Sequence, residues 1–126
     1  MLKISTAIIS IAISTQVVLS PTYERKDETI VAEVTAYTSS EDETDDTPNI
    51  TASQKQVQEG MVACPRRYEF GTKFTIEGKT YICEDRMHKR YDNRFDIWMA
   101  NKEEAIKWGV QTLQVTIHTH GNSSDN

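Results

Sequence analysis

Short runs of alternating apolar and polar residues recur along most of the chain, and they restrict its fold more than any other feature. Thr29–Tyr37 is rich in Val, Ile and Thr, and Phe95, Ile97 and Met99 alternate with their neighbours. Val110–His118 forms a last, loosely alternating run. A period of two is typical of strands that bury one face. We therefore expect a mainly β protein.

A hairpin and one helix complete the expected elements. Lys73–Ile76 and Thr80–Cys83 flank the short Gly-containing segment Glu77–Lys79, which indicates a hairpin. Asn101 is placed to cap a helix that Gly109 would end. Many short strands with one short helix and no βαβ rhythm favour a small barrel over helices packed on a parallel sheet.

The length of 126 residues fits one folded domain. We expect a signal peptide or N-terminal membrane anchor over residues 1–20 and a linker over 21–29. The barrel would occupy residues 30–119, and a disordered tail residues 120–126.

The first residues indicate export. Met1–Leu19 carries a single charge, at Lys3, followed by a mainly apolar stretch. This is the pattern of a secretory signal, although an uncleaved membrane anchor or a first core strand or helix is also compatible with it. We expect an exported protein, in the cell envelope or outside the cell.

The charge balance argues against nucleic acid as a partner. Lys and Arg number 14 against 19 Asp and Glu, which gives a net charge of −5. Proteins that bind nucleic acid non-specifically need a basic surface to replace the counterions of its phosphates. The acidic run over residues 41–46 is either a solvated loop or an irregular cation site. His118 and His120 would share one strand face near a polar tail, which is a poor metal motif. We expect no metal and no other cofactor.

The two cysteines point to one covalent link. In an exported chain Cys64 and Cys83 would form a disulfide, because oxidising compartments allow one to persist. In the cytosol two buried free thiols would be the better interpretation.

Two carboxylates are the candidates for chemistry. Asp85 and Asp96 lie at or within apolar strands, and the basic loop Arg86–Arg94 separates them as a rim. Such a pair can divide the labour of glycoside cleavage, one acid protonating the leaving oxygen while the other stays ionised. Alternatively, Asp96 is a strand residue paired with Arg94 or Arg86.

Taken together, the segments between Val34 and His118 resemble a known family. The chain is similar to the 3D domain, named for three aspartates, which in turn resembles the catalytic barrel of the membrane-bound lytic transglycosylase A group. The matching segments, in chain order, are Val34–Tyr37, Ile50–Ser53, Phe70–Lys73, Glu84–Asp85, Arg94–Ile97 and Glu103–Gly109. The resemblance implies a six-stranded double-psi β-barrel with one short helix near the C-terminus.

The resemblance also implies roles for individual residues. Asp96 would be the general acid/base that cleaves the bond between N-acetylmuramic acid and N-acetylglucosamine in peptidoglycan, with Asp85 as its carboxylate neighbour. The pKa of Asp96 is expected to be raised, by burial or by Asp85. The residues expected to contact peptidoglycan glycan strands in a monomeric protein are Tyr37, Thr51, Ser53, Arg86 and Arg94.

The chain departs from the family pattern at two places. Cys64 stands where the family has its first aspartate, and residues 86–89 replace the usual glycines after the second. Cys83 would share a strand face with Asp85, so a disulfide to Cys64 could replace a polar tie between strands. The departures leave three hypotheses: a peptidoglycan lytic transglycosylase, a non-catalytic, expansin-like module that binds cell-wall glycan, and an accessory or inhibitory protein acting through Arg86–Arg94.

Overall fold

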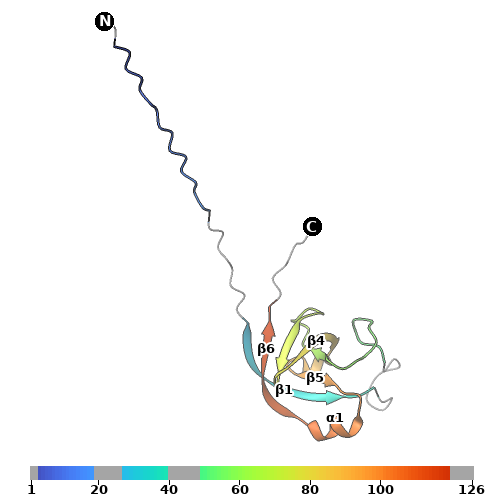
Figure 1. The fold of residues 1–126 in the computed structure, drawn as a ribbon. Helices are drawn as coiled ribbons and strands as arrows, with labels where there is room; N and C mark the ends of the chain where they lie inside the picture. The colour runs from blue at the N-terminus through green and yellow to red at the C-terminus, as the bar shows by residue number, and fades with distance from the viewer. Residues whose placement is uncertain (1–2, 19–26, 40–48, 120–126) are drawn as a thin grey trace.

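The strands of this chain close into a barrel in a computed structural model that describes residues 3–18, 27–39 and 49–119 (Figure 1). The elements are β1 (Glu28–Tyr37), β2 (Met61–Cys64), β3 (Lys73–Ile76), β4 (Lys79–Arg86), the 3-10 helix η1 (Lys89–Tyr91), β5 (Phe95–Trp98), α1 (Lys102–Trp108) and β6 (Gln111–His118). The prediction of a mainly β, six-stranded barrel with one short helix near the C-terminus is confirmed.

The order of strands around the barrel explains its double-psi character. The order is β1-β5-β2-β4-β3-β6, with β6 paired to β1 to close the barrel. The parallel pairs are β1 with β5 and β2 with β4, and β2 runs antiparallel to β5. β1 and β2, which lie on either side of β5, therefore run in opposite directions. β4 and β5, which lie on either side of β2, also run in opposite directions. The strands β1, β5, β2 and β4 therefore lie side by side in the barrel wall.

The barrel interior is the hydrophobic core of the protein. Tyr68, Phe74 and Phe95 form an aromatic cluster, and the Phe74 and Phe95 rings meet edge to face with centroids 4.9 Å apart. The buried residues of the core cluster are Ala32, Val34, Val62, Cys64, Phe74, Ile76, Tyr81, Cys83, Phe95, Ile97, Val115 and Ile117. The core comes from alternate positions of each strand, so the intervening positions face outward.

The predicted hairpin and helix both form. Glu77 and Gly78 join β3 to β4 with positive φ angles of 51° and 75°, which is the backbone of a type I′ turn. Asn101 caps α1 by accepting hydrogen bonds from the backbone N–H groups of Glu103 and Glu104. Trp108 at the other end of α1 donates its indole N–H to the Val34 carbonyl, which fixes the helix against β1.

The apolar N-terminal stretch contributes nothing to the barrel. Residues 3–18 have no helix or strand, and all of them are exposed. No helix among the described residues is long and apolar enough to cross a membrane. The predicted tail, most of the predicted linker and the acidic run over 41–46 lie outside the described residues.

Candidate functional site

The two predicted acids lie on neighbouring strands at the same level of the barrel. Thr35 of β1 is in register with Asp96 of β5, and Ala63 of β2 is in register with both Asp96 and Asp85. These residues form a row across four adjacent strands, which we call the acid row: Thr35, Asp96, Ala63 and Asp85. The acid row faces away from the core, because its members alternate with core residues of each strand.

A β-bulge places Asp85 in the acid row. Val62 is in register with Cys83 but Ala63 with Asp85, so Glu84 is an extra residue in β4. Cys83 therefore points into the core while Asp85 points outward. The expectation that Cys83 and Asp85 share a strand face was wrong, because a bulge breaks the period of two.

Asp85 is held by three hydrogen-bond donors. Its Oδ1 accepts from the backbone N–H groups of Ala52 and Arg86, each at 2.9 Å. Its Oδ2 accepts from the Tyr37 hydroxyl at 2.8 Å. Both oxygens act as acceptors, which is the hydrogen-bonding role of an ionised carboxylate. Asp85 is thus fixed in position and oriented toward β1.

Asp96 is held by the strand beside it. The Thr35 hydroxyl lies 2.9 Å from Asp96 Oδ1 and 3.3 Å from the Phe95 carbonyl. Both Asp96 and Asp85 are half-buried, so solvent and solutes can reach them. Thr35 was not among the predicted site residues, although its position two residues before Tyr37 on the same strand face is a signal that could have identified it.

Tyr37 reaches from β1 to Asp85 and lies within the electrostatic influence of Asp96. Its hydroxyl donates to Asp85 across two intervening strands. Burial raises the pKa of Tyr37 far above its usual value, and the Asp85 charge, the Asp85 hydrogen bond and the Asp96 charge raise it further. Tyr37 therefore stays a neutral phenol and a hydrogen-bond donor over the physiological pH range.

The segment over residues 49–57, which we call the covering loop, brings Thr51 and Ser53 to the acid row. The Thr51 and Ser53 hydroxyls lie 3.0 Å apart, and Thr51 is buried. The loop is closed by an isolated bridge between Ile50 and Gln56 and is joined to β4 by the Ser53 N–H donating to the Glu84 carbonyl. With the Ala52 hydrogen bond to Asp85, these contacts place the predicted hydroxyl residues beside the second acid.

An ion pair between an exposed lysine and a buried glutamate joins the covering loop to β4. Lys55 Nζ lies 2.8 Å from Glu84 Oε1, and the Glu84 side chain is only 6% exposed. Burial raises the pKa of Glu84, but side-chain hydrogen bonds from Lys55 and Ser53, together with the Lys55 charge, outweigh it, so the net pKa is lowered. Glu84 Oε2 has no hydrogen-bond partner among the described residues. Sequence reasoning missed this pair because the bulge that buries Glu84 has no sequence signature here.

The disulfide is present and joins two strands of the acid row. Cys64 of β2 and Cys83 of β4 are bonded, and both are fully buried. Arg86 packs beside it: its guanidinium Nη1 lies 3.2 Å from Cys64 Sγ and donates to the Tyr68 carbonyl at 2.7 Å. The guanidinium also stacks 3.9 Å from the centre of the Phe70 ring. Arg86, predicted to bind substrate, has its guanidinium engaged by the turn after β2.

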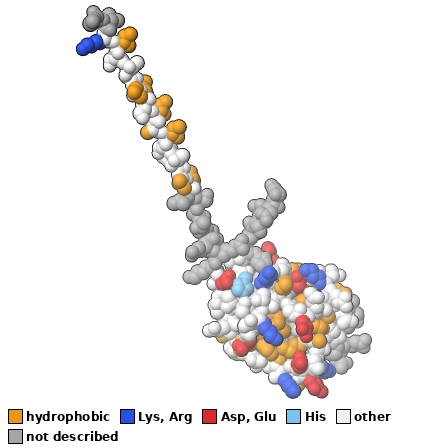
Figure 2. Space-filling model, in the orientation of Figure 1, with side chains coloured by type: hydrophobic (Ala, Val, Ile, Leu, Met, Phe, Trp, Pro, Cys, Tyr) orange, Lys and Arg blue, Asp and Glu red, His pale blue; other side chains and the backbone are white. Residues whose placement is uncertain are grey.

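Arg94 is also engaged by the protein. Its guanidinium forms an ion pair with Glu33 of β1, and it lies 4.7 Å from the centre of the Tyr91 ring. The remaining basic residues of the predicted rim, Lys89 and Arg90, are exposed on η1. On the face seen in Figure 2, acidic and basic side chains are interspersed.

His118 has two side-chain partners within the fold. Its Nε2 lies 2.6 Å from the Thr75 hydroxyl, and its Nδ1 lies 2.9 Å from Asp27 Oδ2. His120 lies outside the described residues. Within the described ranges, no group of three or more His, Cys, Asp or Glu side chains is placed to hold a metal ion.

The structure thus brings together Tyr37, Thr51, Ser53, Asp85 and Asp96, and gives Arg86 and Arg94 other partners. Comparison with protein-family models and with curated proteins found no match for this chain. A functional assignment therefore depends on the geometry and chemistry of the acid row.

Proposed function

We propose that this protein is an exported lytic transglycosylase of the 3D-domain type, which cleaves the glycan strands of peptidoglycan. The observation that carries the proposal is the acid row: two half-buried carboxylates flank Ala63 on one outward face. Asp96 accepts a hydrogen bond from the Thr35 hydroxyl, and Asp85 accepts from the Tyr37 hydroxyl and from the Ala52 N–H of the covering loop. A pair of carboxyl groups that flank the scissile bond is the usual catalytic equipment for cleaving glycosidic bonds.

In this mechanism Asp96 is the catalytic acid and base. Protonated Asp96 transfers its proton to the glycosidic oxygen between N-acetylmuramic acid and N-acetylglucosamine, and the bond from that oxygen to C1 breaks. The C6 hydroxyl oxygen of the muramic acid attacks C1, forming the C1–O6 bond, and its proton passes to Asp96. The products are a 1,6-anhydro sugar and a free C4 hydroxyl, and no water is consumed. One carboxyl serves both steps.

The two acids have different surroundings, which supports different roles. Asp96 accepts a hydrogen bond from the Thr35 hydroxyl and lies in a regular strand. Asp85 accepts from two backbone N–H groups and Tyr37, so it is an acceptor of fixed orientation. Its negative charge would balance the positive charge that develops on the sugar ring in the transition state. Asp85 is therefore the electrostatic partner and Asp96 the proton carrier.

The Cys64–Cys83 bond is compatible with the exported location that the proposal requires. Disulfides persist in oxidising compartments and are rare in the cytosol. The apolar stretch at residues 3–18, exposed in its entirety, is available as a leader or anchor.

The position of Cys64 favours one alternative function. In the 3D family this position carries an aspartate, whereas here the side chain faces the core and is bonded to Cys83. A barrel that has lost one of three acids could retain its surface and bind cell-wall glycan without cleaving it. The alternative is a non-catalytic, expansin-like wall-binding module.

Mass spectrometry of soluble products distinguishes the two functions. The protein lacking residues 1–20, its Asp96→Asn variant and an Asp27→Asn control are each incubated with purified peptidoglycan. Asp27 is bonded to His118, away from the acid row, so it tests the effect of an aspartate substitution alone. We expect 1,6-anhydro products from the unsubstituted protein and from Asp27→Asn, and none from Asp96→Asn. If all three proteins sediment with peptidoglycan and none releases products, the proposal of an enzyme is overturned and the wall-binding module is supported.

A further inference from the structure

The bulge in β4 places two consecutive acidic residues, Glu84 and Asp85, against the covering loop. Two consecutive residues of the loop contact them. The Ala52 N–H donates to Asp85 Oδ1 at 2.9 Å, and the Ser53 N–H donates to the Glu84 carbonyl at 3.1 Å. One short piece of the loop therefore contacts both acidic residues. A shift of the loop relative to Glu84 would also shift the Ala52 N–H relative to Asp85.

The Glu84 side chain adds an anchor for the loop. It is almost fully buried, and its Oε1 lies 2.8 Å from Lys55 Nζ. Burial raises the pKa of Glu84, but hydrogen bonds from Lys55 and Ser53, together with the Lys55 charge, lower it by more, so Glu84 is ionised at neutral pH. An ionised carboxylate that is buried needs its partner, because water cannot replace it. The pair therefore resists separation of the loop from β4.

The anchor depends on one oxygen of Glu84. The other oxygen, Oε2, is enclosed and has no hydrogen-bond partner among the residues that the structure describes. An acceptor without a donor contributes nothing to holding the loop. Loss of the Lys55 amine would therefore remove the cation that holds this carboxylate, and Lys55 is the residue through which the anchor can be tested.

The Asp85 carboxylate has one donor that depends on the loop. Its Oδ1 accepts from Ala52 and from the N–H of the next residue, Arg86, and its Oδ2 accepts from Tyr37 of β1. The donors from Arg86 and Tyr37 belong to the strands, so they stay in place if the loop moves. Without Ala52 the Oδ1 atom would keep one donor of two, and the carboxylate could rotate more freely.

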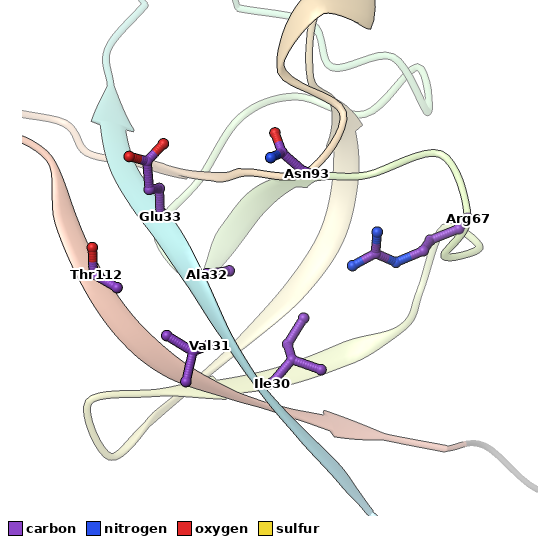
Figure 3. Close-up of a pocket in the computed structure, with 7 residues that line it drawn as sticks. All are labelled: Ile30, Val31, Ala32, Glu33, Arg67, Asn93 and Thr112. Carbon is purple, nitrogen blue, oxygen red and sulfur yellow. The ribbon is translucent and has the colours of Figure 1, made fainter.

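The hollow beside β1 shows no comparable arrangement (Figure 3). It has a volume of about 370 Å³, and Arg67 is the single cation among its lining residues. Ile30 and Ala32 project from the opposite face of β1 to Val31 and Glu33, so the lining groups do not converge on one point. The covering loop, in contrast, directs its contacts to two adjacent residues of β4.

We propose that Glu84 is a positioning residue for Asp85. Paired with Lys55, Glu84 holds the covering loop against β4, and the loop holds the Asp85 carboxylate in its orientation through the Ala52 N–H. The Glu84 side chain is enclosed and does not contact a substrate, so it acts only through the loop. The consequence for turnover rests on the proposed function, in which Asp85 balances the charge of the transition state, whereas the hold on the loop does not.

Amide hydrogen exchange of the full chain measures the hold on the loop without requiring activity. Lys55→Met keeps the length of the side chain but removes the charge that pairs with Glu84. We expect the Ala52 N–H to exchange roughly 10- to 100-fold faster in Lys55→Met, the range for losing a hydrogen bond to a charged group. Lys55→Arg, which restores the charge, should return the slow exchange.

A matched variant controls for the loss of a charge. Lys79→Met removes a lysine from the other end of β4 and should leave exchange at Ala52 unchanged. Exchange at Ala52 that is equally slow in Lys55→Met and in the unsubstituted protein would overturn the proposal. Exchange that rises equally in Lys55→Met and Lys79→Met would also overturn it, because the effect would then come from net charge.

Kinetics separate positioning from a general loss of stability. At a temperature where all variants are folded, Lys55→Met and Glu84→Gln should lower kcat roughly 10- to 100-fold with little change in KM, because the orientation of Asp85 matters in the transition state. Asn101→Ala removes the cap of α1, which also destabilises the fold, but it should leave kcat unchanged. Equal kcat in Lys55→Met and the unsubstituted protein would overturn the positioning role.

The two measurements distinguish failure of this proposal from failure of the enzyme. If the unsubstituted protein releases no anhydro products, the transglycosylase is overturned, and faster exchange at Ala52 in Lys55→Met would still support the hold on Asp85. If products are released and exchange at Ala52 does not depend on Lys55, the positioning role alone is overturned.

Discussion

The two strands that carry the acids hold them in different ways. The end of β4 is crowded with fixed contacts: the bulge at Glu84, the disulfide at Cys83, the stacked Arg86 and the three donors to Asp85. β5 is a regular four-residue strand in which Asp96 lies between Phe95 and Ile97 of the core. The end of β4 therefore holds its candidate acid at a bulge, whereas β5 holds Asp96 in a regularly paired strand.

The strongest test of this difference is the amide substitution of each acid. Asp96→Asn removes the proton that the reaction transfers, so turnover should fall by about 10²- to 10⁴-fold. Its free energy of unfolding should change by less than about 1 kcal/mol, because the amide oxygen can still accept from Thr35. Product release and thermal unfolding are measured on the same samples.

Asp85→Asn should affect both activity and stability. The amide oxygen can take the place of Oδ1 and accept from the two backbone N–H groups, but the amide NH2 replaces the acceptor Oδ2, so the Tyr37 hydroxyl must change from donor to acceptor. We expect a loss of about 1–3 kcal/mol in the free energy of unfolding together with reduced turnover. Equal stability of Asp85→Asn and Asp96→Asn would contradict the contrast between β4 and β5.

Removal of the disulfide should have the next largest effect and should act through β4. Cys64 and Cys83 are 19 positions apart, and the chain-entropy model gives about 3 kcal/mol for closing a loop of that length. The double variant Cys64→Ala with Cys83→Ala should lose about that much stability to urea. Reductant should destabilise the unsubstituted protein and leave the double variant unchanged. A double variant as stable as the oxidised protein would show that the disulfide does not support β4.

The strands other than β2 were predictable because each has a local signal, whereas β2 is buried at every position and does not alternate. Alternation predicted the β1 and β6 segments, the Gly-containing connection predicted the β3–β4 hairpin, and Asn101 with Gly109 bounded the helix. The barrel class followed from the absence of βαβ rhythm, and its double-psi order came from the family resemblance. The pairing of Cys64 with Cys83 followed from the cysteine count and the leader.

The details of the candidate site were less predictable because they depend on contacts between distant residues. The bulge that turns Asp85 outward and buries Glu84 arises from the pairing of β4 with β2. The composition of the loop suggested a basic rim that is available to a substrate. In the structure the guanidinium groups of Arg86 and Arg94 are bound to other segments of the protein, which the local sequence does not reveal. Residue type and order predicted Asp85 and Asp96 as the candidate acids, but only the strand register places them in one row.

The Lys55–Glu84 pair makes the stability of the β4 region depend on pH. The pKa of Glu84 is lowered in the folded state, so the pair stabilises the fold above pH 4.5, its ordinary value, and this stability is lost as the pH falls through the lowered pKa. Lys55→Ala should cost about 1–2 kcal/mol at neutral pH, since solvent screens the exposed lysine. Urea unfolding at pH 7 and pH 3 measures the effect. The difference in free energy of unfolding between the unsubstituted protein and Glu84→Gln should be smaller at pH 3 than at pH 7. A difference that does not change with pH would contradict a lowered pKa of Glu84.

The smallest expected effect on stability concerns Tyr37 of β1, whose hydroxyl donates to Asp85 of β4. Tyr37→Phe removes one of three donors to Asp85 and should cost about 1 kcal/mol. Because burial and then the charges of Asp85 and Asp96 raise the Tyr37 pKa, the folded protein resists forming this phenolate and loses stability as the pH rises above 10.0. Ultraviolet titration of the five tyrosines should show a late-ionising fraction from Tyr37 and Tyr81, whose pKa burial also raises. Tyr37→Phe should remove part of that fraction. If Tyr37→Phe leaves the late-ionising fraction unchanged, the Tyr37 hydroxyl is not buried against Asp85 in solution.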